Sequence, residues 1–290
     1  MFELSVIIAE APGQTDIERT LASVERACAG RPTEVIVVRP AGRPAVRNSA
    51  SVHLRECACD EALLVPERWG IGVRSARAPA FACLTTEFVV LPRWAEVLLG
   101  ALAGGAIGAA GAIELEADAS LAAAATYLIR YSPYLPGSGN VRPNASNIPG
   151  DTAAYQTAAV TAFPDLLVKG FWEVDFHRRF HEAGGRLEWL PEAVAIFSTE
   201  CSFYTTLLLR YRHAREFGVG RVMQQGHSRW RLIVMAPLVP LVMTFRVVRR
   251  VWQVPARRSL AIRALPSLLA IGVAWAAGEA AGAWSVQGRS

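Results

Sequence analysis

The chain has 290 residues, of which 52% are apolar, with a mean hydropathy of +0.25 and a formal net charge of +5. This length allows one sizeable α/β domain with an appendage, and the apolar content is high for a purely soluble protein. The charge is uneven, because residues 201–290 hold thirteen Arg, no Lys and two Glu, a net charge of +11. A basic tail with apolar stretches indicates membrane lipid as its partner, and the absence of any RNA- or DNA-binding motif argues against nucleic acid.

The number and spacing of the cysteines argue against disulfide bonds and against a zinc site. The five cysteines are odd in number, and Cys57 and Cys59 have no matching second pair, so neither a disulfide framework nor a zinc site is expected. No signal peptide precedes Leu4, and we therefore expect the amino-terminal domain in the cytoplasm with reduced thiols.

The amino-terminal segment has the pattern of an α/β fold. The apolar run Leu4–Ala9 predicts a buried strand, a helix with a capping-type start is expected from Thr15 through Ala29, and a second strand is expected at Glu34–Val38. Strand, helix and strand within about forty residues predict a right-handed βαβ unit and a parallel sheet.

The later elements alternate in the same way. We expect a helix that begins near Gly72 and reaches Leu84, a strand at 87–91, a small-residue strand at 107–114, a helix at 120–132, a helix from Glu173 to Gly184, and two short strands at 186–190 and 193–197 that Pro191 separates.

The helix expected at Glu173 carries two carboxylates at its start. Glu173 and Asp175 fall in its first turn, where the helix dipole favours the ionised form, and His177, Arg178 and Arg179 follow on the next turn. Such a cluster at the junction of a turn and a helix is a candidate site for acid–base chemistry.

The segment 170–197 resembles the family-2 glycosyltransferases, which are inverting enzymes of the GT-A fold. In that family a Gly-Phe turn precedes a Glu-Asp pair, an apolar-acidic run, an Arg and an Ala-Gly pair. Trp172 here falls on the Glu, Glu173 on the Asp that serves as catalytic base, and Arg179 on the Arg. The resemblance implies that Glu173 is the base, with Asp175 as the next candidate. The alternative is that both carboxylates only complement the helix dipole.

The resemblance covers about residues 3–200, and the nucleotide-contact motifs depart from the family. The family's second strand ends in an Asp that holds the nucleotide base, whereas this one runs into Arg39 and Pro40. Its Asp-x-Asp metal motif is expected at Leu91–Trp94, where the chain reads Leu-Pro-Arg-Trp. We therefore expect no metal cofactor.

Several other residues are candidates for substrate contact. Arginines could offset part of the diphosphate charge that a metal would otherwise neutralise; the alternative for them is a solvated surface. The loop Asn147–Tyr155 resembles the family's acceptor-side loop, with an Asp in place of the usual Asn after Gly150. The candidates for substrate binding are Arg74, Arg77, Arg93, Asp151, Trp172 and Arg179.

The tail contains two apolar blocks. Leu232–Phe245 would reach about 21 Å as a helix, short of a bilayer core of about 30 Å, whereas Ala264–Trp284 is long enough to span it. We expect an interfacial or re-entrant first block and a second block that spans or packs against it; the alternative is a buried hairpin of a soluble protein. Glu279 should face protein or headgroups, and the spacing of Gly278 and Gly282 favours close helix contact.

These observations predict a GT-A-like α/β domain at 1–200, with a Rossmann-type mixed sheet flanked by helices. A basic helical connector at 201–231 and a membrane-associated helical hairpin at 232–290 follow. The expected activity is transfer of a sugar from a nucleotide-sugar donor to a lipid-linked or cell-surface glycan acceptor at the cytoplasmic face of the inner membrane. The other hypothesis is a non-catalytic relative that binds a glycan, a lipid carrier or a partner enzyme. The missing metal aspartates favour that relative, and the acidic helix start favours the enzyme.

Overall fold

The computed structural model of the chain describes residues 1–13, 16–47, 49–137, 142, 144–199, 202–223 and 225–286, so the cap expected at Thr15 lies outside the described part. The chain forms two compact units. The first comprises Met1–Glu116 and Pro136–Ser198, and the second comprises Ala117–Leu135 and Thr199–Ser290. A segment from the middle of the chain therefore packs with the C-terminal helices. The three-part division at residues 200 and 231 stays a prediction.

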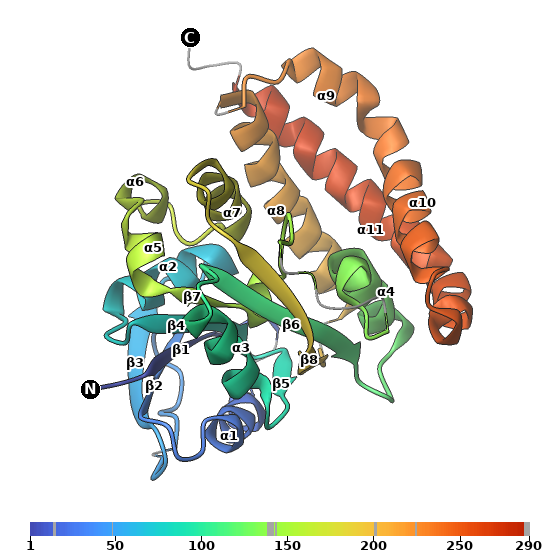
Figure 1. Ribbon diagram of the computed structural model, residues 1–290. Helices are drawn as coiled ribbons and strands as arrows, with labels where there is room; N and C mark the ends of the chain where they lie inside the picture. The colour runs from blue at the N-terminus through green and yellow to red at the C-terminus, as the bar shows by residue number, and fades with distance from the viewer. Residues whose placement is uncertain are drawn as a thin grey trace. The chain divides into compact units, whose positions relative to one another are not determined.

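The first unit is built on a mixed sheet that has eight strands within the described residues, in the order β3-β2-β1-β4-β7-β6-β8-β5 (Figure 1). The strands β3, β2, β1 and β4 are parallel, and β7 is antiparallel to both of its neighbours. Every residue of β1 and β2 is buried, as expected for central parallel strands. The strands are β1 Leu4–Ala9, β2 Thr33–Pro40, β3 His53–Cys59, β4 Ala80–Thr85, β5 Phe88–Val90, β6 Gly108–Leu115, β7 Ala154–Gln156 and β8 Leu187–Phe197.

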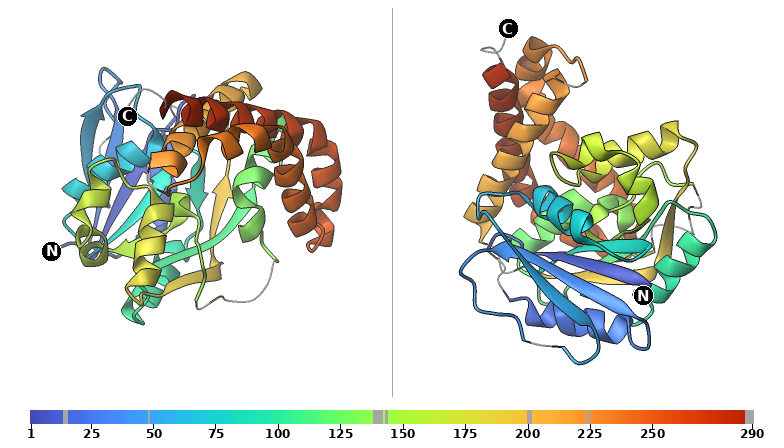
Figure 2. Two further views of the ribbon diagram at one scale, coloured as in Figure 1. Left: turned by 90° about the horizontal axis from the view of Figure 1, so that it is seen from above. Right: turned by 90° about the vertical axis from the view of Figure 1, so that its left-hand side faces the viewer.

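The helices α1 and α2 lie on opposite faces of this sheet (Figure 2, right). The chain runs outward from β1 to β2 and β3, and then returns to place β4 on the other side of β1. In open α/β sheets, ligands bind outside the carboxyl ends of the strands at such a reversal. The carboxyl ends of β1 and β4 are therefore the expected position of a ligand site. The helices of this unit are α1 Glu18–Ala27, α2 Val65–Ser75, α3 Trp94–Ala103, the short η2 Gly150–Thr152, α5 Thr157–Thr161, α6 Pro164–Leu167 and α7 Glu173–Glu182.

Two glycines let α2 lie close to its neighbours. A methyl group on Gly72 would clash with the side chain of Ile7 in β1, and one on Gly70 would lie 2.5 Å from the Cα atom of Gly170. The indole nitrogen of Trp69 donates a 2.9 Å hydrogen bond to the carbonyl of Leu84 in β4. The helix α2 thus joins the central strands to the turn that precedes α7.

The segment after α2 differs from the sequence-based expectation. The helix ends at Ser75 and does not reach Leu84, because Ala80–Thr85 forms the buried strand β4 beside β1. The apolar run expected as the next strand forms β5, which pairs antiparallel with β8. The residues that follow the parallel strand β4 are therefore Thr86 and Glu87, whereas Leu91–Trp94 follows β5.

One strand replaces the two short strands expected on either side of Pro191. The strand β8 continues through this residue, and its register against β6 shifts between Gly111 and Ile113. A proline is tolerated in a strand at such a bulge, where the ladder is already interrupted. A methyl group on Gly111 would clash with the carbonyl of Ala193, so the bulge also requires a glycine on the facing strand.

The second unit is helical. Its longest helix, α11, contacts α8, α10, α9 and α4. Two stretches, Arg229–Val251 and Pro255–Ser285, are long and apolar enough to cross a membrane by length and composition. The helices are α4 Leu121–Tyr131, η1 Ser132–Tyr134, α8 Phe203–Met223, α9 Arg229–Met235, η3 Ala236–Leu238, α10 Val239–Val251, η4 Pro255–Arg257 and α11 Arg258–Ser285.

The close contact expected at Gly278 and Gly282 is confirmed. Methyl groups there would clash with the carbonyls of Tyr211 and Arg215 in α8. The adjacent Glu279 is buried and forms a 2.6 Å ion pair with Arg221 of α8. The expectation that Glu279 faces protein or headgroups is therefore also confirmed, with protein as its partner.

Candidate functional site

The turn before α7 places Glu173 at the start of the helix. Gly170 has a φ of 111°, a backbone conformation that residues with a Cβ atom rarely adopt. The amide of the next residue, Phe171, donates a 2.7 Å hydrogen bond to the carbonyl of Pro66. The helix begins at Glu173, after the N-cap residue Trp172. The exposed amides of a helix start and the helix dipole both favour an ionised carboxylate at this position.

Glu173 and Asp151 come together although they are distant in sequence. A methyl group on Gly150 would lie 2.7 Å from the Cγ atom of Glu173, so the glutamate lies directly on the η2 turn that contains Asp151. Both carboxylates are near Cys83 in β4. Burial raises the pKa of this thiol well above its usual value, and the charges of Glu173 and Asp151 raise it further. The structure therefore brings two carboxylates together beside the central strand β4.

A buried polar chain supports the first turns of α7. His177, one turn beyond Glu173, contacts the hydroxyl of Tyr155 through Nε2 at 2.9 Å and Asn147 Oδ1 through Nδ1. Burial and, as the smaller cause, the charge of His181 together lower the pKa of His177 to about 3. The imidazole is therefore neutral at physiological pH, where it ties α7 to β7 and to the loop before η2.

This pKa predicts a pH dependence of stability. The folded state binds a proton on His177 less tightly than the unfolded chain does. The contribution of neutral His177 to the free energy of unfolding is therefore complete above about pH 6.5, and it is lost as the pH falls toward 3. In denaturant titrations between these values, the His177→Gln variant should show a pH slope shallower than that of the parent by up to about 1.4 kcal/mol per pH unit. Equal slopes would show that His177 is protonated in the folded state as readily as in the unfolded one.

The carboxyl ends of β1, β2 and β3 carry a cluster of charged residues that the sequence analysis did not select. Glu10, directly after β1, is buried and forms a 3.0 Å ion pair with Arg43. The buried Arg68 of α2 donates hydrogen bonds to the carbonyls of Glu10 and Glu61. Arg39, at the end of β2, pairs with Glu56 of β3 at 2.6 Å. The available signal was position, because Glu10 directly follows β1, Arg39 lies at the end of β2, and Arg68 lies in the helix after β3.

The turn that follows β4 is fixed from two sides. The amide of Ala11 donates a 2.9 Å hydrogen bond to Oγ1 of Thr86, and Oγ1 of Thr20 donates to the carbonyl of Phe88 at 2.8 Å. Glu87, half-buried in this turn, donates its amide to Oγ1 of Thr85. The carboxylate at the end of the central strand is therefore Glu87.

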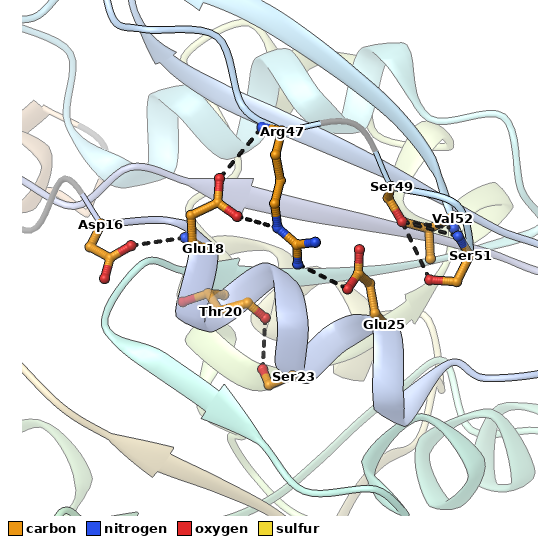
Figure 3. A network of polar contacts seen from close by, with 9 residues as sticks. All are labelled: Asp16, Glu18, Thr20, Ser23, Glu25, Arg47, Ser49, Ser51 and Val52. Carbon is orange, nitrogen blue, oxygen red and sulfur yellow. Dashed lines mark hydrogen bonds and ion pairs between the residues drawn. The ribbon is translucent and has the colours of Figure 1, made fainter.

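A polar network braces the neighbouring loop against α1 (Figure 3). Arg47, in the loop after β2, pairs with Glu18 and, at 3.2 Å, with Glu25, both on α1. The amide of Glu18 donates a 3.0 Å hydrogen bond to the carboxylate of Asp16. The same helix holds the β4–β5 turn through Thr20, so α1 fixes two of the loops at the carboxyl edge of the sheet.

The side chains of the remaining candidates contact other groups. Arg74 donates to the carbonyl of Leu167, Arg77 precedes β4 at the amino-terminal edge of the sheet, and Arg93 pairs with Glu192 at 3.5 Å. Asp175 pairs with Arg178 one turn along α7, Arg179 lies over the ring of Phe163, and the Trp172 indole donates to the carbonyl of Lys169. These contacts hold the turns and helices around the site, and their role in substrate binding stays a prediction.

The turn after β4 offers few ligands for a divalent metal. The turn after β4 supplies one carboxylate, Glu87, where metal sites of this kind use several oxygen ligands. Within the described ranges, no three side chains of the metal-binding types His, Cys, Asp and Glu are grouped as ligands. The described side chains alone therefore do not supply a full ligand set for a divalent cation, and the proposed chemistry is written without one.

Comparison with solved structures supports the fold. No family model matches the chain, and no curated protein matches it. Solved structures of S. aureus TarS 1-349 are similar in fold at 11% sequence identity. The complex with UDP has a TM-score of 0.51 and covers 99% of this chain and 92% of TarS 1-349. The complex with UDP-GlcNAc has a TM-score of 0.51, with 96% and 90% coverage. The expectation of a GT-A-like α/β fold followed by helices is confirmed.

Proposed function

We propose that this chain is an inverting glycosyltransferase. It transfers a sugar from a nucleotide-diphosphate donor to a lipid-linked or cell-surface glycan acceptor at the cytoplasmic face of the inner membrane. The observation that carries the proposal is the placement of Glu173, with Asp151 beside it, next to the central strand β4 of a GT-A-like fold. The UDP and UDP-GlcNAc complexes of TarS make UDP-sugars the first donors to test.

The chemistry needs one base and one leaving-group site. Glu173 removes the proton from an acceptor hydroxyl, whose oxygen attacks the anomeric carbon of the donor sugar. The bond between that carbon and the diphosphate oxygen breaks, and the nucleotide diphosphate leaves with the electron pair. Attack opposite to the leaving group inverts the anomeric centre. The dipole at the start of α7 keeps Glu173 ionised and ready to accept the proton.

We place the donor at the carboxyl ends of β1 to β4. Glu10, Arg39, Arg43 and Arg68 gather there, and the topological reversal between β1 and β4 favours ligand binding at the same edge. Arginines bind phosphate oxygens well because their planar guanidinium groups donate several hydrogen bonds in a fixed geometry. Of these residues, the partly exposed Arg43 is better placed for the diphosphate than Arg77 and Arg93, which lie away from this edge.

The competing function is a non-catalytic relative that binds a glycan, a lipid carrier or a partner enzyme. The observation in its favour is the turn after β4. This turn supplies one carboxylate, Glu87, where the family carries the two aspartates of its metal motif. A screen of nucleotide release decides between the two functions. Purified full-length protein in detergent should release nucleotide from one donor of a nucleotide-sugar panel when a lipid extract supplies the acceptor. Binding of a donor with no release from any would favour the non-catalytic function.

Chelation provides a second test of this chemistry. Since the described side chains alone do not form a divalent-metal site, transfer should persist in excess EDTA at more than about half of its rate. A metal-dependent enzyme would lose several kcal/mol of transition-state stabilisation, and most of its rate, under the same conditions. Strict dependence on added Mn²⁺ or Mg²⁺ would mean that the donor itself or other parts of the chain complete a ligand set. The measurement is the initial rate of nucleotide release with and without the chelator.

A further inference from the structure

One face of the helix α11 is covered by protein and another is exposed. Its buried residues face α4, α8 and α10 along the whole helix. The large apolar residues that remain exposed are between 37% and 58% accessible and recur at helical spacing. They are Ile262, Leu269, Val273 and Trp284, with the exposed Pro266 and Ala277 between them. A helix in the interior of a soluble bundle would not leave such an apolar stripe uncovered.

The neighbouring helices extend this exposed surface. The rings of Trp230 in α9 and Trp284 in α11 lie 5.9 Å apart, and both tryptophans are about half exposed, so the two helices share one apolar area. In α9, η3 and α10 the exposed apolar residues are Trp230, Val234, Met235, Leu238, Leu241, Val242 and Phe245. We call these residues, together with the stripe of α11, the apolar face of the second unit. Its extent exceeds the isolated exposed apolar residues that any soluble protein shows.

Charge and aromatic residues at the ends of this face identify its occupant. Arg229 and Arg231 flank Trp230 at one end, and at the other end Arg258 lies over the ring of Trp252 at 5.5 Å. Tryptophan and arginine at the borders of an apolar surface are typical of the boundary between lipid tails and anionic headgroups. A shallow hollow of about 350 Å³ on α10 combines both properties, since it is lined by Leu241, Val242, Phe245, Arg246 and Arg249. The matching partner is a bilayer with anionic lipids.

The packing of α8 argues against a crossing of that bilayer. The carbonyls of Tyr211 and Arg215 lie against Gly278 and Gly282, so α8 runs beside the C-terminal half of α11 without space for lipid. The helix α8 also carries Arg212, Arg215 and Glu216, all exposed. If α11 spanned the membrane, these charges would enter the hydrocarbon beside it, which is strongly unfavourable.

We propose that the second unit is monotopic: its apolar face enters one leaflet of an anionic membrane, and neither α10 nor α11 crosses the bilayer. This proposal rests on the membrane location in the proposed function and specifies its geometry. The Arg221–Glu279 pair then stays on the covered side of α11, where it fixes α8 to α11 outside the lipid. The loops at both ends of α9 and α10 lie on the same side of the membrane.

Cysteine labelling tests this topology in the full chain. His227 lies in the exposed connection between α8 and α9, and Gln253 in the exposed connection between α10 and η4. With His227→Cys and Gln253→Cys, a membrane-impermeant maleimide should label both sites in inverted membrane vesicles and neither in intact spheroplasts. The unsubstituted chain gives the background of its native cysteines. Labelling of the two sites from opposite sides would overturn the proposal, because α9 and α10 would then cross the bilayer.

Vesicle binding tests the face itself. The double variant Leu241→Glu, Phe245→Glu should reduce co-sedimentation with vesicles of phosphatidylcholine and phosphatidylglycerol at least about tenfold, because it places two charges in the lipid. Tyr204→Glu on α8 is the matched control, since Tyr204 is 76% exposed but lies outside the apolar face. Circular dichroism confirms that each variant is folded.

Unchanged binding of a folded double variant, or binding abolished by high salt in the parent, would overturn the proposal that the apolar face enters the lipid. Self-association with no lipid binding would instead assign the face to a second copy. Loss of sugar transfer with the labelling and binding intact would refute only the proposed function.

Discussion

Replacement of Glu173 by Gln should lower the rate of sugar transfer at least about 100-fold, because the amide cannot accept the acceptor's proton. The fold should survive. The side chain keeps its shape against Gly150, and the loss of a charge at a helix start costs only about 0.3–1 kcal/mol. The measurement is kcat/KM for nucleotide release, with the melting temperature recorded for both proteins.

Asp175→Asn is the matched control for this substitution. Asp175 lies on the same first turn of α7, but its carboxylate pairs with Arg178 at 3.2 Å and is separate from the Glu173–Asp151 pair. Its loss should change the rate less than about threefold, in line with the small energy of a partly exposed ion pair. A large loss in Asp175→Asn with near-normal turnover in Glu173→Gln would move the base to Asp175.

Replacement of Gly70 by Ala should impair both stability and transfer. The added methyl group would lie 2.5 Å from the Cα atom of Gly170, and its three nearest neighbours are all backbone atoms of the turn that precedes Glu173. Overpacking of this kind costs about 1–3 kcal/mol. Because the turn must shift, Glu173 moves with it, and we expect a fall in transfer of at least about tenfold. Denaturant unfolding and the rate of nucleotide release provide the two measurements.

Gly100→Ala separates this effect from the general consequence of removing a helix glycine. Gly100 lies inside α3, and a methyl group there meets no atom within 4 Å among the described residues. We expect this variant to be more stable by about 0.5–1 kcal/mol, with an unchanged rate. If Gly70→Ala behaved in the same way, the contact between α2 and the Gly170 turn would not position the base.

Several elements could be predicted because their residues carry local signals. The apolar runs of β1 and β2, the Ser120 cap of α4 and the first-turn acids of α7 each satisfy a rule that depends on neighbouring residues. The strand β4 was missed because its small residues also suit a helix. Pro79, directly before it, was the signal against helix continuation, since a proline disfavours the helical conformation of the residue that precedes it.

The candidate site was harder to predict because its contacts are distant in sequence. Glu173 could be selected from its helix start, but its position against Gly150 depends on packing between α7 and η2. The pairing of Glu10 with Arg43 across the strand ends follows from the order of the strands, which no local pattern determines. Likewise, the single strand β8 depends on a bulge opposite Gly111, a feature of two strands together.

The central claim is that Glu173 catalyses sugar transfer from a bound nucleotide-sugar. Its most direct test is a single-turnover assay with membranes from cells that express the full chain, a donor from the release screen that carries a radiolabelled sugar, and extraction of lipid and glycan products. We predict that the parent chain transfers label to one of these fractions, and that Glu173→Gln binds the donor with similar affinity but transfers at least about 100-fold less. Equal transfer by both proteins, or donor binding with no transfer by the parent, would contradict the account.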